Sequence, residues 1–145
     1  MTDQGQLLSA LGDAGYRVTA PRRSVTELIA GRTGHFTAAD LVTDARGRRL
    51  GIGRATIFRA LDLFEELGLI ERLDLPTGEH AYIPCERVHH HHVICTSCGQ
   101  TEEVDDPGID GVTRSIARRT GYRIDSHRLD LFGLCPACAG AADLA

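Results

Sequence analysis

The sequence has 145 residues, of which 42% are hydrophobic and 25% are charged, a length that allows one domain or two small ones. No apolar run approaches the roughly 18 residues of a membrane-spanning helix, and the first thirteen residues lack the basic start of a signal peptide. We therefore expect a cytoplasmic protein with no membrane partner, in which the five cysteines are metal ligands or reactive thiols rather than structural disulfides.

The formal net charge of −4 is unevenly spread along the chain. Residues 1–60 hold nine arginines and five acidic residues, a balance of +4, whereas residues 61–145 hold seven arginines and fifteen acidic residues, a balance of −8. All sixteen basic residues are arginine, whose planar guanidinium suits contacts with phosphate and guanine. The charge distribution predicts a different function for each half of the chain.

Three helices are expected first. Leu7 and Leu11 belong to a short apolar stripe in the opening segment, and the second helix begins near Pro21, a residue tolerated in a first turn. Thr37 and Asp40 resemble a capping box that starts the third helix, although Asp stands where Glu is usual.

The stretch GIGRATIFRALDLFEELGLI (51–70) predicts a fourth helix. Ile57, Leu61 and Phe64 form an apolar stripe, and Arg54 and Arg59 lie off it, where a recognition helix addresses bases. LIERLDL-PTG-EHAYI (69–83) then predicts two strands around a turn. Helices followed by a hairpin are typical of a winged helix-turn-helix; the alternative is a generic helical domain with solvated arginines.

Two C-x-x-C pairs dominate the second half: Cys95 with Cys98, and Cys135 with Cys138. Four thiolates can close a tetrahedral zinc site with no open position. The residues between the pairs have room for a strand (101–104), a helix (107–120) and another strand (122–132). A redox pair would explain one C-x-x-C motif but not two, so the spacing predicts a structural zinc site in a small α/β domain.

Four consecutive histidines precede the first pair. If this run is extended, His90 and His92 point to one face while His89 and His91 point to the other, because side chains in a strand alternate. The run can therefore serve two metal sites. The candidate partners elsewhere in the chain are Cys85, Glu71, His35, His127 and Asp110.

Taken together, these features resemble those of the ferric uptake regulator family of metal-dependent repressors. The matching motifs are GYRVTAPRRSV, ATIFRALDLFEELGLI, TGEHAYI, HHHHVICTSCG and SHRLDLFGLCPAC, in this order. The resemblance implies an α+β chain with a winged-helix DNA-binding domain (1–83) and an α/β dimerisation and metal-binding domain (84–145). It also implies a homodimer that binds AT-rich inverted repeats in double-stranded DNA and represses metal-uptake or stress genes.

The resemblance also assigns ligands. Cys95, Cys98, Cys135 and Cys138 are similar to the structural zinc ligands of the family. A site inside the dimerisation domain is implied for His89, His91, Asp110 and His127. His90 and His92 resemble half of the sensory site.

The other sensory ligands differ between branches of the family and decide the metal. The iron-sensing branch has Glu where this chain has Ile83, and the peroxide-sensing branch has Asp where it has Pro84. The zinc-uptake branch has a cysteine at the position of Cys85, and some of its members add an acid at the position of Glu71. A thiolate with two imidazoles favours zinc, while His35 matches an iron-type ligand and is the rival.

The function implied is a zinc-responsive repressor, with an iron- or other-metal-responsive repressor as the alternative. A zinc hydrolase is the alternative from another class, but it needs an open coordination position and a general base, and no H-E-x-x-H motif occurs. Phe58 stands where the family usually has Tyr and keeps an apolar surface for a thymine methyl. The expected DNA contacts are Arg17, Arg22, Arg23, Arg54, Thr56, Phe58 and Arg59.

Overall fold

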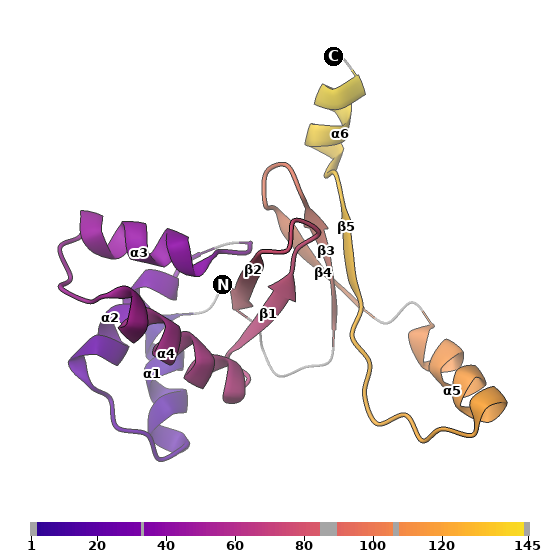
Figure 1. The fold of residues 1–145 in the computed structure, drawn as a ribbon, viewed down its shortest axis with the longest axis horizontal. Coiled ribbons are helices and arrows are strands. Elements are labelled where there is room, and N and C mark those ends of the chain that lie inside the picture. The colour runs from indigo at the N-terminus through magenta and orange to yellow at the C-terminus, as the bar shows by residue number, and fades with distance from the viewer. Residues whose placement is uncertain (1–2, 33, 85–89, 106–107, 144–145) are drawn as a thin grey trace. The chain divides into compact units, whose positions relative to one another are not determined.

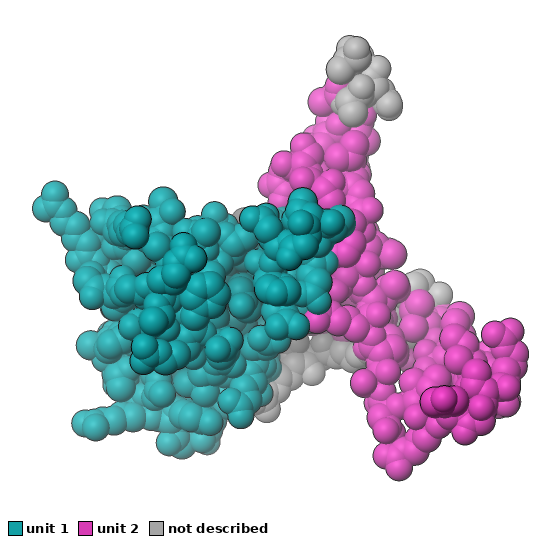
Figure 2. All heavy atoms as spheres, viewed as in Figure 1, with its two compact units in different colours: residues 1–87 teal, residues 88–145 magenta. Residues whose placement is uncertain are grey.

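The computed structural model describes residues 3–32, 34–84, 90–105 and 108–143. The chain divides into two compact units, residues 1–87 and 88–145 (Figure 2). None of the helices in these described ranges is long and apolar enough to cross a membrane.

The first unit is a set of helices followed by a hairpin (Figure 1). Its elements are α1 (Gln4–Asp13), α2 (Ala20–Ile29), α3 (Ala38–Gly47), α4 (Arg54–Glu66), β1 (Ile70–Asp74) and β2 (His80–Pro84). The two strands are antiparallel, with Ile70 opposite Pro84 and Asp74 opposite His80. Phe36, just before α3, forms an isolated bridge with Tyr82 of β2 and ties the hairpin to the helices.

Side chains at the starts of the first three helices explain where these helices begin. Asp3 accepts from the backbone of α1 and forms a capping box with Gln6, and the hydroxyl of Thr19 accepts from the backbone of α2. Thr37 and Asp40 form the predicted capping box of α3, with Asp in place of the usual Glu. Each such cap contributes about 1 kcal/mol to helix stability.

The core of the first unit joins all four helices and the hairpin. The predicted stripe of α4, Ile57, Leu61 and Phe64, is completely buried in it. Burying each such side chain contributes roughly 1.5–3 kcal/mol. The other large, fully buried side chains of this core are Leu7, Leu11, Leu28, Ile29, Phe36 and Leu41.

The second unit is built around a small sheet. Its elements are β3 (His91–Cys95), β4 (Thr101–Val104), α5 (Ile109–Thr120), β5 (Asp130–Gly133) and α6 (Pro136–Asp143). The strand order is β4-β3-β5, with β3 antiparallel to β4 and parallel to β5. Figure 1 shows α5 apart from this sheet, and none of the helix's residues is buried.

Two elements of the second unit differ from the sequence prediction. The strand expected over 122–132 is present only as β5, because the ladder with β3 begins at Asp130, and residues 121–128 have no strand paired with them among the described residues. The helix α6 was not predicted. Pro136 occupies its first position, where a missing backbone N–H costs nothing, and the alanines that follow favour a helix.

Candidate metal centres and DNA-binding face

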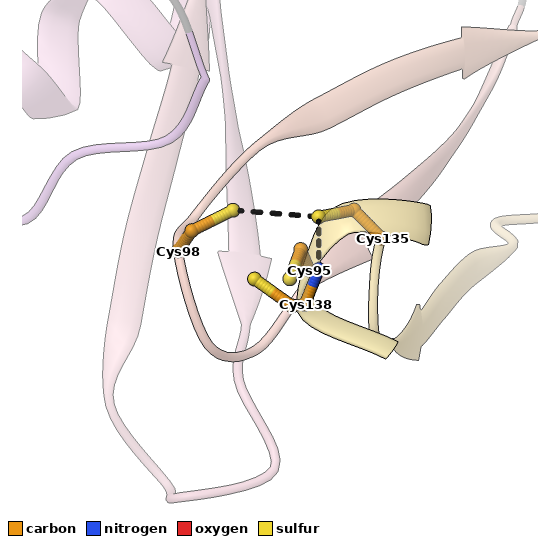
Figure 3. Close-up of side chains that lie close together, drawn as sticks. All are labelled: Cys95, Cys98, Cys135 and Cys138. Carbon is orange, nitrogen blue, oxygen red and sulfur yellow. Dashed lines mark hydrogen bonds between the residues drawn. The ribbon is translucent and has the colours of Figure 1, made fainter. Parts of the chain in front are cut away.

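The four cysteines of the two C-x-x-C pairs lie together in the second unit. Cys95 ends β3 and Cys98 lies in the turn after it, while Cys135 and Cys138 lie at the start of α6 (Figure 3). All four sulfur atoms lie within 4.8 Å of one another, and those of Cys98 and Cys135 are 3.8 Å apart. Tetrahedral zinc with Zn–S bonds of about 2.3 Å holds its sulfurs about 3.8 Å apart. The four thiolates therefore fit a closed zinc site.

The backbone around these cysteines brings the sulfurs together. The N–H of Cys95 donates to the carbonyl of Gln100 (2.8 Å), and the N–H of Gly99 donates back to the carbonyl of Cys95 (3.0 Å). Gly99 has a φ of 80°, a conformation that glycine adopts without strain. In the second pair, the N–H of Cys138 points to the sulfur of Cys135 at 3.5 Å.

The pKa values of two of these thiols move in opposite directions. Backbone hydrogen bonds from Cys135 and Cys98 lower the pKa of Cys95 to about 6. For Cys138, a side-chain hydrogen bond with Ser97 lowers the pKa, but the neighbouring sulfurs outweigh it and raise the pKa to about 12. Cys95 therefore ionises readily, whereas Cys138 resists ionisation. This is expected where several thiols lie so close together that a cation would neutralise their shared negative charge.

His90 and His92 meet on one side of β3. Their Nε2 atoms are 3.1 Å apart and their rings are nearly perpendicular. Two imidazoles on a tetrahedral zinc, with Zn–N bonds of about 2.0–2.1 Å, hold their nitrogens about 3.3–3.4 Å apart. His92 is completely buried, and only 8% of the His90 side chain is exposed. The pair therefore fits half of a metal site.

Glu103 of β4 lies beside this pair of histidines, a neighbour that the sequence analysis missed. Its Oε1 lies 3.7 Å from Nε2 of His90, and the residue lies opposite His92 in the antiparallel register. Pairing the predicted strand 101–104 with the histidine strand would have revealed it.

Of the other predicted sensory residues, Glu71 and His35 belong to the first unit. Cys85 falls outside the described residues. Glu71 lies on β1 of the first unit, opposite Ile83, and His35 precedes Phe36 in the same unit.

The predicted site inside the dimerisation domain is assembled in part. The rings of His91 and His127 are 5.2 Å apart, and Asp110 and His127 line one shallow depression. Within the described ranges these three residues do not form a cluster of ligand atoms at metal-binding distance. His89 falls outside those ranges.

The predicted recognition helix presents a polar face with one large apolar side chain. Arg54, Phe58 and Arg59 are exposed on α4, on the side away from the buried stripe. Phe58 has 39% of its surface exposed, and Thr56 is half-buried. This face combines the donors and the apolar surface that base edges require.

The arginines before and within α2 differ in whether contacts with the rest of the unit hold their side chains in place. Nη1 of Arg22 donates to the carbonyl of Arg17 (2.7 Å), and its guanidinium lies 5.7 Å from the centre of the Tyr16 ring. Arg17 and Arg23 are exposed. Arg22 is therefore held in place, whereas Arg23 extends into solvent.

Comparisons with known proteins agree with this geometry. The sequence profile of the ferric uptake regulator family matches residues 13–132. A ferric uptake regulation protein of Neisseria meningitidis is 34% identical over 132 residues, which cover 90% of this chain and 92% of the relative. The solved structure of the Vibrio cholerae ferric uptake regulator has a TM-score of 0.68 at 31% identity, covering 88% of this chain and 98% of that one.

The fold is also similar to that of a zinc uptake regulator complexed with zinc and DNA. The TM-score is 0.77 at 24% identity, over 97% of this chain and 95% of the other. These likenesses confirm the predicted fold class, an N-terminal winged helix-turn-helix followed by a small α/β domain.

Proposed function

The chain belongs to the ferric uptake regulator family of metal-responsive transcription regulators, and we propose that it is a zinc-responsive repressor that binds operator DNA as a homodimer. Family membership, predicted from the sequence motifs, is confirmed by these matches. Because the members of this family are transcription regulators and not enzymes, the hydrolase alternative has no support.

The observation that carries the proposed metal response is the pair His90 and His92. Two imidazole nitrogens 3.1 Å apart on a buried strand face are arranged to bind one ion. Cys85, ten residues before Cys95, supplies a thiolate to the proposed set, and Glu71 supplies a carboxylate. A thiolate with two imidazoles favours zinc over harder divalent ions.

A second candidate is an iron-responsive repressor, and Glu103 favours it. Two histidines with one carboxylate are a ligand set typical of iron(II), and Glu103 lies 3.7 Å from His90. In this alternative His35 replaces Cys85 as a ligand.

The four cysteines are proposed to hold a separate, structural zinc. Their sulfurs match the spacing of a closed tetrahedral site, and the second unit has little apolar core to replace it. Metal-binding energy at such a site is largely folding energy.

Exposed apolar residues support the proposed homodimer. Val112 and Ile116 of α5 have 56% and 40% of their surfaces exposed, and Leu131 of the edge strand β5 has 46%. Apolar surface of this kind on one small unit marks an interaction site. A second copy of the chain would cover it.

DNA binding is proposed to depend on a population shift. Bound zinc would supply a link between the second unit and the hairpin of the first. Glu71 on β1 and the ligands on and before β3 would then hold each winged helix in one orientation. In the dimer, two α4 helices at a fixed spacing would fit successive major grooves of an AT-rich inverted repeat.

A metal titration of DNA binding tests the proposed metal. Wild type and Cys85→Ser are titrated with zinc and with iron(II) on DNA that bears the inverted repeat, and His80→Ala serves as the control for loss of an exposed histidine. We expect Cys85→Ser to remain dimeric with one tightly held zinc per chain and to need far more added zinc than wild type. Overlapping zinc curves, with iron(II) response lost in His35→Ala or Glu103→Gln, would favour the iron-responsive alternative.

A further inference from the structure

Asp130 lies behind His92, on the side opposite His90. It is the first residue of β5 and is paired in register with His92 of β3. Oδ1 of Asp130 is 3.4 Å from Nδ1 of His92, and both atoms are completely shielded from solvent. Nε of Arg128 donates to the other oxygen, Oδ2, at 3.0 Å. The carboxylate therefore stands between an arginine and a buried imidazole.

Because it is buried, the contact between Asp130 and His92 carries a large energetic weight. A carboxylate oxygen removed from water is costly unless a donor or a positive charge faces it, and only 12% of the Asp130 side chain is exposed. Arg128 satisfies Oδ2, and His92 is the group that faces Oδ1. At 3.4 Å the contact is longer than most hydrogen bonds, and an N–H on Nδ1 would place a donor beside this oxygen and leave a lone pair on Nε2, the atom that faces His90.

We propose that Asp130 is a positioning residue for the sensory metal site: its carboxylate selects the Nδ1–H tautomer of His92 and fixes the ring so that Nε2 is presented beside that of His90. Arg128 holds Asp130 in this orientation. The proposal rests on the sensory role of His92 proposed above. Carboxylates that accept from the second nitrogen of a metal-binding histidine raise its basicity and fix its orientation.

The hairpin of the first unit contains the same three residue types in a different setting. Asp74 lies 3.5 Å from Nε of Arg72, two residues away, and 2.7 Å from Nδ1 of His80, its partner across the strands. About 60% of both the Asp74 and the His80 side chains is exposed. Asp74 therefore provides a matched control for the loss of an aspartate that contacts one arginine and one histidine.

The first test reads the tautomer directly. Long-range proton–nitrogen NMR of the histidine rings, on the dimer loaded with structural zinc only, reports which nitrogen of His92 carries the hydrogen. We expect Nδ1–H in wild type and in Asp74→Asn, and a mixture or Nε2–H in Asp130→Asn and Asp130→Ala. A wild-type His92 that carries its hydrogen on Nε2 would overturn the proposal.

The second test measures metal affinity apart from DNA. A chromophoric chelator competes for the second zinc, and cobalt(II) in the same site reports ligand geometry through its visible absorption bands. We expect Asp130→Ala to weaken the second zinc about 10- to 100-fold and to change the cobalt bands, Arg128→Gln to weaken it less, and Asp74→Asn to match wild type. One zinc per chain that stays tightly held in each variant shows that the fold is retained.

The outcomes separate this inference from the proposed function. If wild type binds a second zinc that His92→Ala loses, but Asp130→Ala binds it as tightly as wild type with the same cobalt bands, Asp130 has only a structural role. If His92→Ala binds the second metal as wild type does, both proposals are wrong. A variant that loses the structural zinc as well is replaced by Arg128→Gln, whose unchanged affinity and tautomer would count against the positioning role.

Discussion

The two units bury different kinds of side chain. In the first unit, fifteen described apolar residues form one continuous core. In the second, only His91, His92, Ile94 and Cys95 are buried within the described ranges, and three of these four are of metal-binding types. A unit of this size with so little apolar core requires a metal, a partner or both to be stable.

This difference also appears at the helix ends. Three of the four helices of the first unit begin at a side-chain cap, whereas α4, after Gly53, and α5 of the second unit, after Gly108, have none. The first unit therefore carries its stability in local signals and apolar packing. We infer that the second depends on groups from outside its own chain segment, namely zinc and a second copy.

Removing one structural thiolate should give the largest effect. Cys138→Ser leaves zinc with three sulfurs, and metal binding on the order of 10 kcal/mol is coupled to folding at such sites. We expect the backbone amides of β3 and β4 to lose protection from hydrogen exchange while those of α4 keep it. Cys85→Ser is the control, and unchanged protection in Cys138→Ser would show that the second unit does not need the site.

Shortening a buried side chain of the first unit should destabilise that unit alone. Phe64 is completely buried, so Phe64→Ala should cost about 3–5 kcal/mol of the free energy of unfolding. The zinc content of the second unit should not change. Phe58→Ala, at an exposed position of the same helix, should cost less than about 0.5 kcal/mol. Denaturant unfolding with parallel zinc analysis measures both, and equal losses in the two variants would contradict the assignment of the α4 faces.

Substitutions of arginines on the first unit should weaken DNA binding without changing the stability of that unit. Arg59→Ala should cost about 1–3 kcal/mol of binding free energy and relax base preference if Arg59 contacts guanine. Arg23→Ala should weaken specific and random DNA alike and reduce the salt dependence. Binding to both DNAs at several salt concentrations distinguishes the two roles, and a uniform loss for Arg59→Ala would make it a phosphate contact.

The smallest effect is expected at a helix cap. Thr37→Ala removes the acceptor for the backbone N–H of Asp40 and should destabilise the first unit by about 1 kcal/mol. Thr120→Ala in α5 is the matched control, because that hydroxyl donates to the carbonyl of Ile116 in its own helix and accepts only a long contact, 3.4 Å, from the backbone N–H of Tyr122. Thermal melts monitored separately for each unit measure the pair. A greater loss for Thr120→Ala would contradict the contrast between the units.

The sequence predicted the first unit well because its signals are local. The stripe of Ile57, Leu61 and Phe64, the Thr37 capping box and the hairpin each depend on neighbours within a few residues. The cysteine cluster was also accessible, since two C-x-x-C pairs have few arrangements other than a shared site. Strand alternation predicted that His90 and His92 share a face, and their Nε2 contact agrees.

Features that depend on pairing between distant strands were missed. Glu103 and Asp130 flank His92 only because β4 and β5 take particular registers beside β3. The extent of β5 was overestimated because residues 122–128 have no described strand to pair with. The sensory roles of Cys85, Glu71 and His35 remain predictions.

The position of the cysteine cluster has a topological consequence. Its two pairs lie at the ends of the segment 99–134, which contains β4, α5 and β5. With zinc bound to all four sulfurs, this segment is a closed ring, and one proteolytic cut in the exposed residues 121–123 would leave both pieces joined through the metal. A chelator would then release two polypeptides from a protein that had behaved as one. Nicked protein would thus report the occupancy of the cluster on a denaturant-free sizing column.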